Sequence, residues 1–352
     1  MKKIFFLAIA QCLSLSALLY FLKKPIHPVS GTVAHYVDEQ RIFDAKPRSL
    51  EVVFWYPTNK SVKTTPQEYG IWKLGDVAVD TPIIPDKLPL ILFSHGFGGD
   101  PYGNSWFAHY LASHGYIVAC VKHYGNAFGN MIPELGARPW NRPLDMSFIL
   151  DKILSDPRFK DHIDANRIGA AGFSQGGMTT LWLAGVKANL DQELLYKYMA
   201  SIKDNEWRSV FENFTQSDIS DANKSYHDDR IKAVFAMAPG LDFNNWMFTK
   251  ESLLTVYTPI YLVVGDADMV VSADEHAKFF AQNIPSSTLT ILSPNVSHWV
   301  FMNESTQEGK KINPKITIDA PGADRTKIHK SVGRTALKFF DTNLKTSSKT
   351  PK

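Results

Sequence analysis

Short apolar runs with strand character alternate with segments of helical periodicity through most of the 352-residue chain. Leu88–Ser94 (LPLILFS) is a continuous apolar run that ends at a glycine-rich turn. Such a run is typical of a strand that is buried on both faces of a parallel sheet. Residues 167–173 (RIGAAGF) have the same form. Alternation of this kind predicts a mostly parallel sheet with helices on both of its faces.

The same pattern divides the chain into segments. The predicted strands are residues 50–56, 88–94, 116–121, 167–173, 231–237, 260–264 and 288–292. The predicted helices are residues 105–114, 144–156, 176–187, 273–282 and 325–343. We expect one α/β domain at 49–343, a linker and an irregular β-rich lead-in at 25–48, and a disordered tail at 344–352.

Residues 188–229 interrupt the alternation, because they are charged, helix-prone and rich in Asp, Asn and Ser. We interpret them as an inserted cap, which would lie over the carboxyl edge of the sheet, where α/β proteins bind ligands. Its aromatic residues Trp207, Phe211 and Phe214 either line a substrate cleft or only fix the insertion to the body.

Composition excludes several classes of function. The formal net charge is only +3 and no block of lysine or arginine is present, so no nucleic-acid partner is expected. Of the two cysteines, Cys12 and Cys120, only Cys120 lies in the domain, where it is expected to be a buried, inert thiol without a disulfide. No zinc pattern and no phosphate-binding loop is found, so neither a metal nor a cofactor is expected.

The first 24 residues read as an export signal or a membrane anchor. Lysine pairs flank an almost uncharged run at residues 4–22, which is about as long as a bilayer-spanning helix requires. This length favours an uncleaved anchor at 1–24 over a cleaved signal. In both cases the domain is expected outside the cytoplasm, either anchored and facing the periplasm or exterior, or secreted.

The sequence GFSQGG at residues 172–177 places Ser174 between a predicted strand and a predicted helix. A serine hydroxyl is a weak nucleophile, and a tight strand-to-helix turn holds it above the sheet where a base can reach it. The sequence HGFGG at residues 95–99 follows an earlier buried strand. The backbone amides of Phe97 and Gln175 would then stabilise an oxyanion, each by about 3 kcal/mol. His95 is expected to hold this loop.

An acid and a base are expected to follow the serine in the order Ser, Asp, His. Asp268 is the preferred acid, because it ends the turn GDAD after a buried strand, with Asp266 capping that turn. Asp242, after the preceding strand, and Asp266 itself stay open as alternatives. His298 is the expected base, because it follows the next strand.

The other histidines fit the role of base poorly. His276 and His329 fall inside predicted helices. His114 and His123 flank the strand before the nucleophile, where a surface or loop role suits them.

With these residues in place, the chain from about residue 49 to 303 resembles the bacterial dienelactone-hydrolase-like proteins that are related to platelet-activating-factor acetylhydrolases. The segments that carry the resemblance are EVVFWYP, LPLILFSHGFGG, LASHGYIVACVKH, RPLDMSFILDKIL, RIGAAGFSQGG, IKAVFAMAPG, TPIYLVVGDADMVV and SHWVF. The resemblance implies an α/β-hydrolase fold with Ser174, Asp268 and His298 as a triad. The acetylhydrolase branch places its acid after the preceding strand, which keeps Asp242 open, and usually carries histidine where this chain has Phe173.

The expected activity is hydrolysis of carboxylic esters through an acyl-enzyme. The resemblance suggests short or oxidised acyl chains of phospholipids as substrates, and the N-terminal segment would bring the site near a membrane. Dienelactone hydrolases use a cysteine nucleophile, so their ring-opening activity is not carried over. Small soluble esters, polyesters of the cutinase type, peptide or acyl transfer, and a catalytically silent binding module stay as alternatives.

Overall fold

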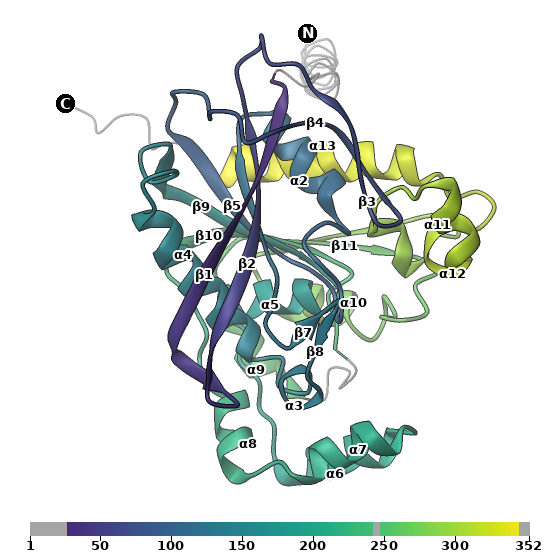
Figure 1. The fold of residues 1–352 in the computed structure, drawn as a ribbon. Coiled ribbons are helices and arrows are strands. Elements are labelled where there is room, and N and C mark those ends of the chain that lie inside the picture. The colour runs from purple at the N-terminus through teal and green to yellow at the C-terminus, as the bar shows by residue number, and fades with distance from the viewer. Residues whose placement is uncertain (1–26, 242–246, 345–352) are drawn as a thin grey trace, which may run out of the picture.

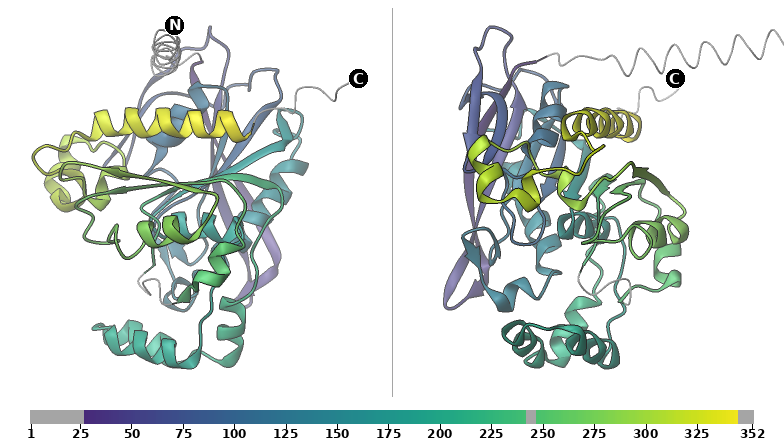
Figure 2. Two further views of the ribbon diagram at one scale, coloured as in Figure 1. Left: turned by 180° about the vertical axis from the view of Figure 1, so that it is seen from behind. Right: turned by 90° about the vertical axis from the view of Figure 1, so that its right-hand side faces the viewer.

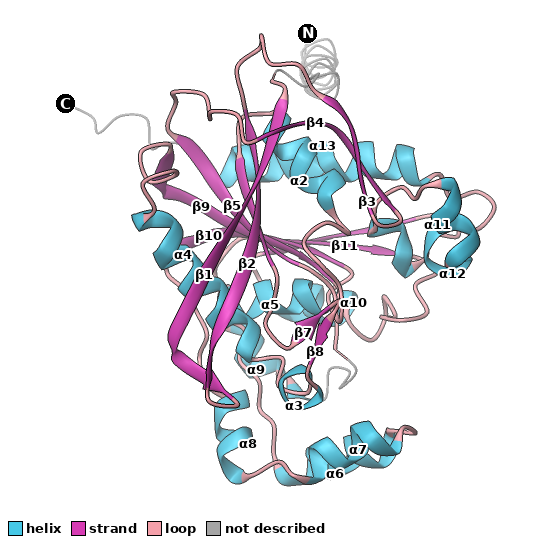
Figure 3. Cartoon of the chain, viewed as in Figure 1, coloured by secondary structure: helices cyan, strands magenta, loops and turns pink. Residues whose placement is uncertain are grey.

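The computed structural model describes residues 27–241 and 247–344, and within them ten strands form one sheet in the order β12-β11-β10-β9-β5-β6-β2-β1-β4-β3 (Figures 1 and 3). The strands are β1 (Val29–Phe43), β2 (Lys46–Pro57), β3 (Thr65–Tyr69), β4 (Trp72–Val79), β5 (Leu88–Ser94), β6 (Ile117–Val121), β9 (Ile163–Phe173), β10 (Ile231–Met237), β11 (Ile260–Gly265) and β12 (Ser287–Leu292). β6, β5, β9, β10, β11 and β12 are mutually parallel, so their carboxyl ends meet at one edge of the sheet.

Helices cover both faces of the sheet. α2 (Ser105–Ser113) and α13 (Arg325–Asn343) pack on one face, while α4 (Asn141–Ser155), α5 (Gln175–Leu183), α9 (Lys250–Leu254) and α10 (Ala277–Asn283) lie mainly on the other (Figures 1 and 2). The α/β-hydrolase fold expected from the sequence is confirmed by this arrangement.

β5 shows why the sequence produces a two-faced core. All seven of its residues are buried, and they alternate between two clusters. Leu90 and Leu92 pack with the helices of one face, whereas Ile91 and Phe93 pack with α2 and α13 on the other. Successive side chains of a strand point to opposite faces, so a strand covered on both sides must be apolar throughout.

The segment before β5 contains strand, as the predicted β-rich lead-in at 25–48 implies, but it is more regular than predicted and little of it is linker. β1 pairs with β2 in antiparallel register from Val29 opposite Pro57 to Phe43 opposite Lys46, with one irregularity between Asp38 and Ile42. Much of β1 is exposed on one face, so polar residues interrupt its apolar pattern and hide the strand from a search for apolar runs. β3 and β4 extend the same side of the sheet and were not predicted.

The inserted segment at 188–229 contains α6 (Gln192–Ser201), α7 (Asn205–Glu212) and α8 (Gln216–Ala222), which lie together below the body in Figure 1. Each helix begins at a polar cap. The side chains of Asp191 and Asp204 accept backbone hydrogen bonds at the starts of α6 and α7, and Thr215 and Asp218 form a capping box at α8. The charged composition of the insertion therefore supports short capped helices.

Three expectations fall on residues outside the described ranges: the anchor or signal at 1–24, the alternative acid Asp242, and all but the first residue of the tail at 344–352. Among residues 27–241 and 247–344, every helix is too short or too polar to cross a membrane.

Candidate active site

Ser174 lies at the junction of β9 and α5 in a strained backbone conformation, with φ 56° and ψ −123°. The flanking glycines make this turn sterically feasible. A Cβ at Gly172 would lie 2.2 Å from the carbonyl oxygen of Gly176, and a Cβ at Gly176 would lie 1.9 Å from that of Ser94. A non-glycine residue with such angles is uncommon, and strain of this kind gathers at functional sites.

Backbone contacts hold the turn in place. The N–H of Ser174 donates to the carbonyl of Met237 at 2.9 Å, and the N–H of Gly240 donates to the carbonyl of Ser174 at 3.4 Å, so the end of β10 supports the turn from both sides. Gln175 is the first residue of α5, and the first N–H groups of a helix have no acceptor within that helix. Its N–H is therefore suited to an anionic oxygen.

His298 and Asp268 form a buried pair at the ends of the next strands. Nδ1 of His298 lies 2.7 Å from Oδ2 of Asp268, and both side chains are almost fully buried. The other oxygen of Asp268 accepts hydrogen bonds from the N–H groups of Val270 at 3.0 Å and Val271 at 2.7 Å. Because a carboxylate only accepts, Nδ1 carries the shared proton and Nε2 is left free to act as a base.

The imidazole of His298 is also packed against the nucleophile turn. His298 begins a short 3-10 helix, η2 (His298–Phe301), and its ring centroid lies 4.7 Å from that of Phe173, which precedes Ser174. The structure thus brings together Ser174, Asp268 and His298, and it places Asp266 in a supporting backbone contact within the same pair of loops.

The loop after β5 lies directly against Ser174. A Cβ built at Gly96 would lie 3.4 Å from Cβ of Ser174, and the N–H of Gly99 closes the turn on the carbonyl of Gly96 at 3.1 Å. Phe97 and Gln175, the residues expected to supply oxyanion donors, both line the cleft that contains Ser174.

This cleft has a volume of about 1030 Å³, which is large for a small-molecule site. Its lining contains Ser174, Phe97, Gln175 and His298. Its other large aromatic residues are Tyr69, Trp72, Phe128, Phe173, Tyr198, Trp207, Phe211 and Trp299. An apolar or aromatic group therefore fits the walls better than a highly charged one.

The three aromatic residues of the cap divide between the two roles expected for them, which are lining the cleft and fixing the insertion to the body. Trp207 and Phe211 line the cleft, and the Trp207 ring packs edge-on against Phe97 at a centroid distance of 5.6 Å. Phe214 instead packs against Trp140 and under the guanidinium of Arg138.

Sequence reasoning missed the wall formed by Ile312 and Ile316, which come from α11 (Gln307–Ile312) and α12 (Pro314–Thr317). This short amphipathic segment carries no pattern that marks it as part of a site.

His123 lies in the loop after β6, but a surface position is wrong, because its side chain is completely buried. Nε2 of His123 lies 2.8 Å from Oγ of Ser94, and Nδ1 lies 3.0 Å from Oδ2 of Asp145 on α4. Burial, together with the nearby charge of Arg142, lowers the pKa of His123 well below its ordinary value. α4 folds over the strand end and covers the imidazole, which the flanking sequence does not reveal.

His95 holds its loop, as expected, and His114 is more buried than expected. Nδ1 of His95 lies 2.7 Å from the carbonyl of Gly96, and its Nε2 accepts the N–H of His123 at 3.3 Å. His114 is buried and its Nδ1 lies 2.7 Å from the carbonyl of Tyr110. Both imidazoles thus serve the backbone around them.

Within the described ranges no three His, Cys, Asp or Glu side chains are arranged to hold a metal ion. Cys120 is buried in β6, and burial raises the pKa of its thiol. A thiol in such surroundings is a poor nucleophile.

Comparison with known proteins supports the fold and the family. The profile described as "Platelet-activating factor acetylhydrolase, isoform II" matches residues 73–128, in agreement with the resemblance drawn from the sequence. A solved ferulic acid esterase from Streptomyces cinnamoneus superposes with a TM-score of 0.59 at 19% identity, covering 94% of each chain. At that identity the superposition shows the fold alone.

The curated relatives that match this chain are longer proteins, of which only a part is covered. Dipeptidyl-peptidase 5 from Porphyromonas gingivalis is 23% identical over 240 residues, which is 62% of this chain and 31% of that protein. Cutinase est1 from Thermobifida alba is 25% identical over 198 residues, which is 56% of this chain and 48% of that protein. The chain thus spans about a third to a half of the length of these two relatives.

The profile described as "Prolyl oligopeptidase family" matches residues 102–311. This match includes the turn at Ser174, the acid loop at Asp268 and the histidine loop at His298. Because it extends over more than half of the chain, the chain belongs to the prolyl oligopeptidase family.

Proposed function

We propose that this chain is a serine hydrolase that cleaves carboxylic esters through an acyl-enzyme formed on Ser174. The observation that carries the proposal is the hydrogen bond between His298 and Asp268, made at the wall of the same cleft that the strained Ser174 turn lines. A nucleophile, a base and a group that orients the base are the requirements of this chemistry.

In the proposed acylation step, Nε2 of His298 accepts the proton of the Ser174 hydroxyl while Oγ attacks the ester carbonyl carbon. The N–H groups of Phe97 and Gln175 donate to the oxygen that becomes negative. Asp268 stabilises the imidazolium ion. The tetrahedral intermediate then collapses, and His298 returns the proton to the departing alcohol. Water, activated by the same imidazole, releases the acid and restores Ser174.

For the substrate we propose an ester with an apolar acyl chain, of the short-acyl phospholipid type. The acetylhydrolase match over residues 73–128 and the aromatic cleft support this choice. The similarity to a cutinase supports polyesters as a further ester class.

Amide hydrolysis by the same triad is the second candidate. It is favoured by the family match over residues 102–311 and by the similarity to dipeptidyl-peptidase 5.

A substrate panel separates these candidates. The protein is assayed with p-nitrophenyl esters from acetyl to dodecanoyl, an sn-2-acetyl phosphatidylcholine, a polyester film and dipeptidyl p-nitroanilides, with Ser174→Ala as the matched control. Turnover of the esters that Ser174→Ala abolishes supports the proposal. Turnover of the anilides alone favours the peptidase, and a wild-type rate equal to that of Ser174→Ala on every substrate contradicts both.

A fluorophosphonate reagent tests the alternative of a silent binding module. Labelling of wild-type protein at Ser174, located by peptide mass analysis, requires an activated hydroxyl. An unlabelled serine in a folded protein would show that the triad is not functional.

We also propose that residues 1–24 carry the domain out of the cytoplasm, on the basis of their charge and apolar length alone. Fractionation of cells expressing the full chain and a chain lacking residues 1–24 tests this. Cytoplasmic recovery of the full chain would overturn it.

A further inference from the structure

Arg142 is a buried cation beneath the loop that carries Phe97. It lies in the first turn of α4 and is only 1% exposed. Its guanidinium donates to the carbonyl oxygens of His95 and Gly96, the latter at 3.0 Å, and to the carbonyl of Asn126 at 3.2 Å. A cation withdrawn from water in this way is unfavourable unless its donors are used, and here Nη1 and Nη2 are used on these backbone carbonyls, while Nε has no partner.

The hydrogen bond from Arg142 to the carbonyl of Gly96 also bears on the direction of the Phe97 N–H. The carbonyl of Gly96 and the N–H of Phe97 belong to one peptide plane, and in a trans peptide these two groups point in opposite directions. Arg142 holds this carbonyl together with Nδ1 of His95 at 2.7 Å and the N–H of Gly99 at 3.1 Å, so the N–H of Phe97 points to the opposite side of the peptide plane. The loop itself lies against Ser174, since a Cβ built at Gly96 would lie 3.4 Å from Cβ of that residue.

Asn126, in the short strand β7 (Asn126–Ala127), joins this loop to the other donor. Its Oδ1 accepts from the N–H of Gly98 at 3.1 Å and from Arg142 at 3.1 Å. Its Nδ2 donates to Oε1 of Gln175 at 3.0 Å. The side chain is 3% exposed, so these contacts are shielded from water. One amide group thus spans the two segments that would supply the oxyanion donors.

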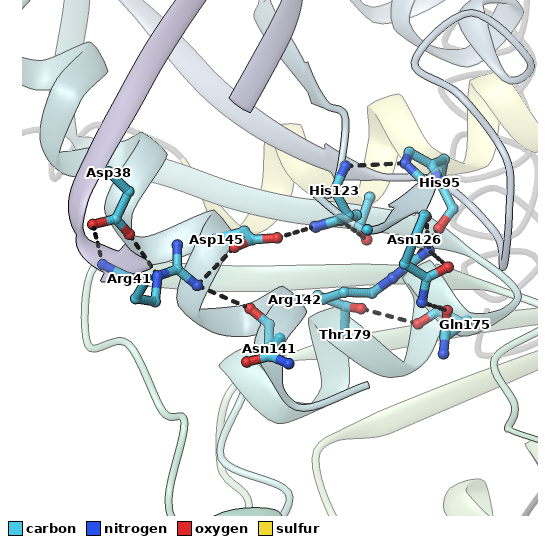
Figure 4. A network of polar contacts seen from close by, with 12 residues as sticks. Asp38, Arg41, His95, His123, Asn126, Asn141, Arg142, Asp145, Gln175 and Thr179 are labelled. Atoms are coloured by element: carbon cyan, nitrogen blue, oxygen red, sulfur yellow. Dashed lines mark hydrogen bonds and ion pairs between the residues drawn. The ribbon is translucent and has the colours of Figure 1, made fainter. Parts of the chain in front are cut away.

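The network extends away from the cleft to the ion pair between Asp145 and Arg41 (Figure 4). Asp145, one turn after Arg142 on α4, lies 3.0 Å from Nδ1 of His123 and 2.7 Å from a guanidinium nitrogen of Arg41. This negative charge lies close to Arg142 and Arg41, and its attraction opposes the loss of their hydration. The buried charges are therefore part of one scaffold that ends at the oxyanion loop.

We propose that Asn126 and Arg142 are positioning residues that set the two oxyanion donors, the N–H groups of Phe97 and Gln175, at the spacing that the tetrahedral intermediate requires. This inference rests on the proposed function of Ser174. Neither side chain is expected to touch the substrate. Because the donors stabilise the transition state more than the bound ester, loosening them lowers kcat and leaves KM nearly unchanged.

The test compares Arg142→Lys and Asn126→Asp with wild-type protein on a p-nitrophenyl ester. Arg142→Lys keeps the charge but loses the planar fork, and Asn126→Asp keeps the shape but can no longer donate to Gln175. Each variant is expected to lose about 10- to 100-fold in kcat, less than the loss from deleting a donor, with KM changed by about twofold or less.

A sulfur-substituted substrate distinguishes positioning from general damage. A thionoester places sulfur, a weak acceptor, where the oxyanion forms, so wild-type protein should strongly prefer the oxygen ester. In both variants this preference should fall by about tenfold, because the donors no longer discriminate. Arg325→Lys is the matched control. Arg325 is also buried and donates to the carbonyls of Asn303 and Ile316, and its replacement should lower the melting temperature without changing the preference.

Two results would overturn the inference. One is a folded Arg142→Lys or Asn126→Asp protein with wild-type kcat, and the other is a reduced kcat with an unchanged preference for the oxygen ester. If Arg142→Lys does not fold, the isosteric Asn126→Asp decides the matter alone. Failure of the proposed function looks different, because wild-type protein would then hydrolyse neither ester.

Discussion

Oδ1 of Asp266 lies 2.8 Å from the backbone nitrogen of Val296, two residues before His298, and accepts its hydrogen bond. The N–H of Ala267 returns a hydrogen bond of 3.0 Å to the carbonyl of Val296. The loop that carries Asp268 and the loop that carries His298 are therefore locked to each other by backbone contacts as well as by the acid–base pair.

Replacing Asp266 with alanine should loosen this lock. We expect kcat for an ester to fall by about tenfold, because removing the partner of a shielded N–H costs about 1–3 kcal/mol and displaces the base. Asp274→Ala, which removes an exposed carboxylate paired with Lys278, is the control and should leave kcat unchanged. Steady-state kinetics decide the matter, and equal rates for both variants would contradict the prediction.

Ser174→Ala should lower turnover by a factor on the order of a million while the fold is kept. Ser174→Gly should be equally inactive but more stable than Ser174→Ala by about 1 kcal/mol, because glycine adopts a positive φ without strain. Chemical denaturation of the two variants measures the difference. A more stable alanine variant would show that the turn is not strained.

Asp268→Asn should reduce kcat by about 10⁴-fold, because the amide no longer favours the tautomer in which Nε2 is the base. Asp242→Asn should have little effect. The two variants are compared in ester hydrolysis at one pH. If only Asp242→Asn lowers the rate by this factor, the acid has been assigned to the wrong strand end.

Trp207 and Phe214 offer a paired test of the cap. Trp207→Ala should raise KM for an apolar ester by about fivefold, since it removes an aromatic wall worth about 1 kcal/mol. Phe214→Ala should lower the melting temperature and leave KM unchanged, because its ring packs on Trp140 and Arg138. A larger change in KM from Phe214→Ala than from Trp207→Ala would contradict this, because it would mean that the packing of the cap on the body, and not the Trp207 ring, determines substrate binding.

His329 should make the protein sensitive to acid. Burial lowers the pKa of its imidazole to about 3, and Nε2 lies 2.7 Å from the carbonyl of Val300. Between the ordinary pKa of about 6.5 and this value, the unfolded chain binds a proton that the folded chain does not. Stability is therefore complete above pH 6.5 and falls on acidification by about 1.4 kcal/mol per pH unit from this group.

His329→Gln removes that contribution, so the free energy of unfolding should depend less steeply on pH between 6 and 4. Urea titrations of wild-type and variant protein at several pH values measure both slopes. Parallel slopes would mean that His329 is protonated in the folded state.

The strands at the centre of the sheet were the most predictable part of the fold. Residues 88–94 and 231–237 were predicted as strands and form β5 and β10 with the same bounds. Burial on both faces demands a continuous apolar run, and such a run is plain in a sequence. β1 and β3 are exposed along much of their length, so polar residues conceal them.

The candidate site could be predicted at those strand ends that are followed by a glycine-rich turn or by an aspartate or histidine. The turns at Ser174 and Phe97 could be predicted from the sequences GFSQGG and HGFGG. The order of the residues along the chain indicated Asp268 and His298. Spacing alone could not separate Asp268 from Asp266, because both lie in one turn. The structure distinguishes them by direction, since one contacts the imidazole and the other a backbone N–H.

The network beneath the oxyanion loop was not predicted. Arg142 and Asp145 are three residues apart in a helix whose neighbouring positions Met146, Ile149 and Ile153 are buried. Charged residues on the apolar face of a helix were the available signal, since buried charges need partners. Those partners come from distant strand ends, and only the folded chain reveals them.

The pairing of β5 with β9 has a consequence for how activity is acquired. Ser94 lies opposite Gly172 in this parallel pair, so the pairing brings together the loop of Phe97 and the turn of Ser174, which are distant in the sequence. A slip of one residue would displace the loop by about 3.3 Å and invert the faces of β5. The rate at which turnover returns during refolding should therefore equal the rate at which β5 and β9 pair in the correct register.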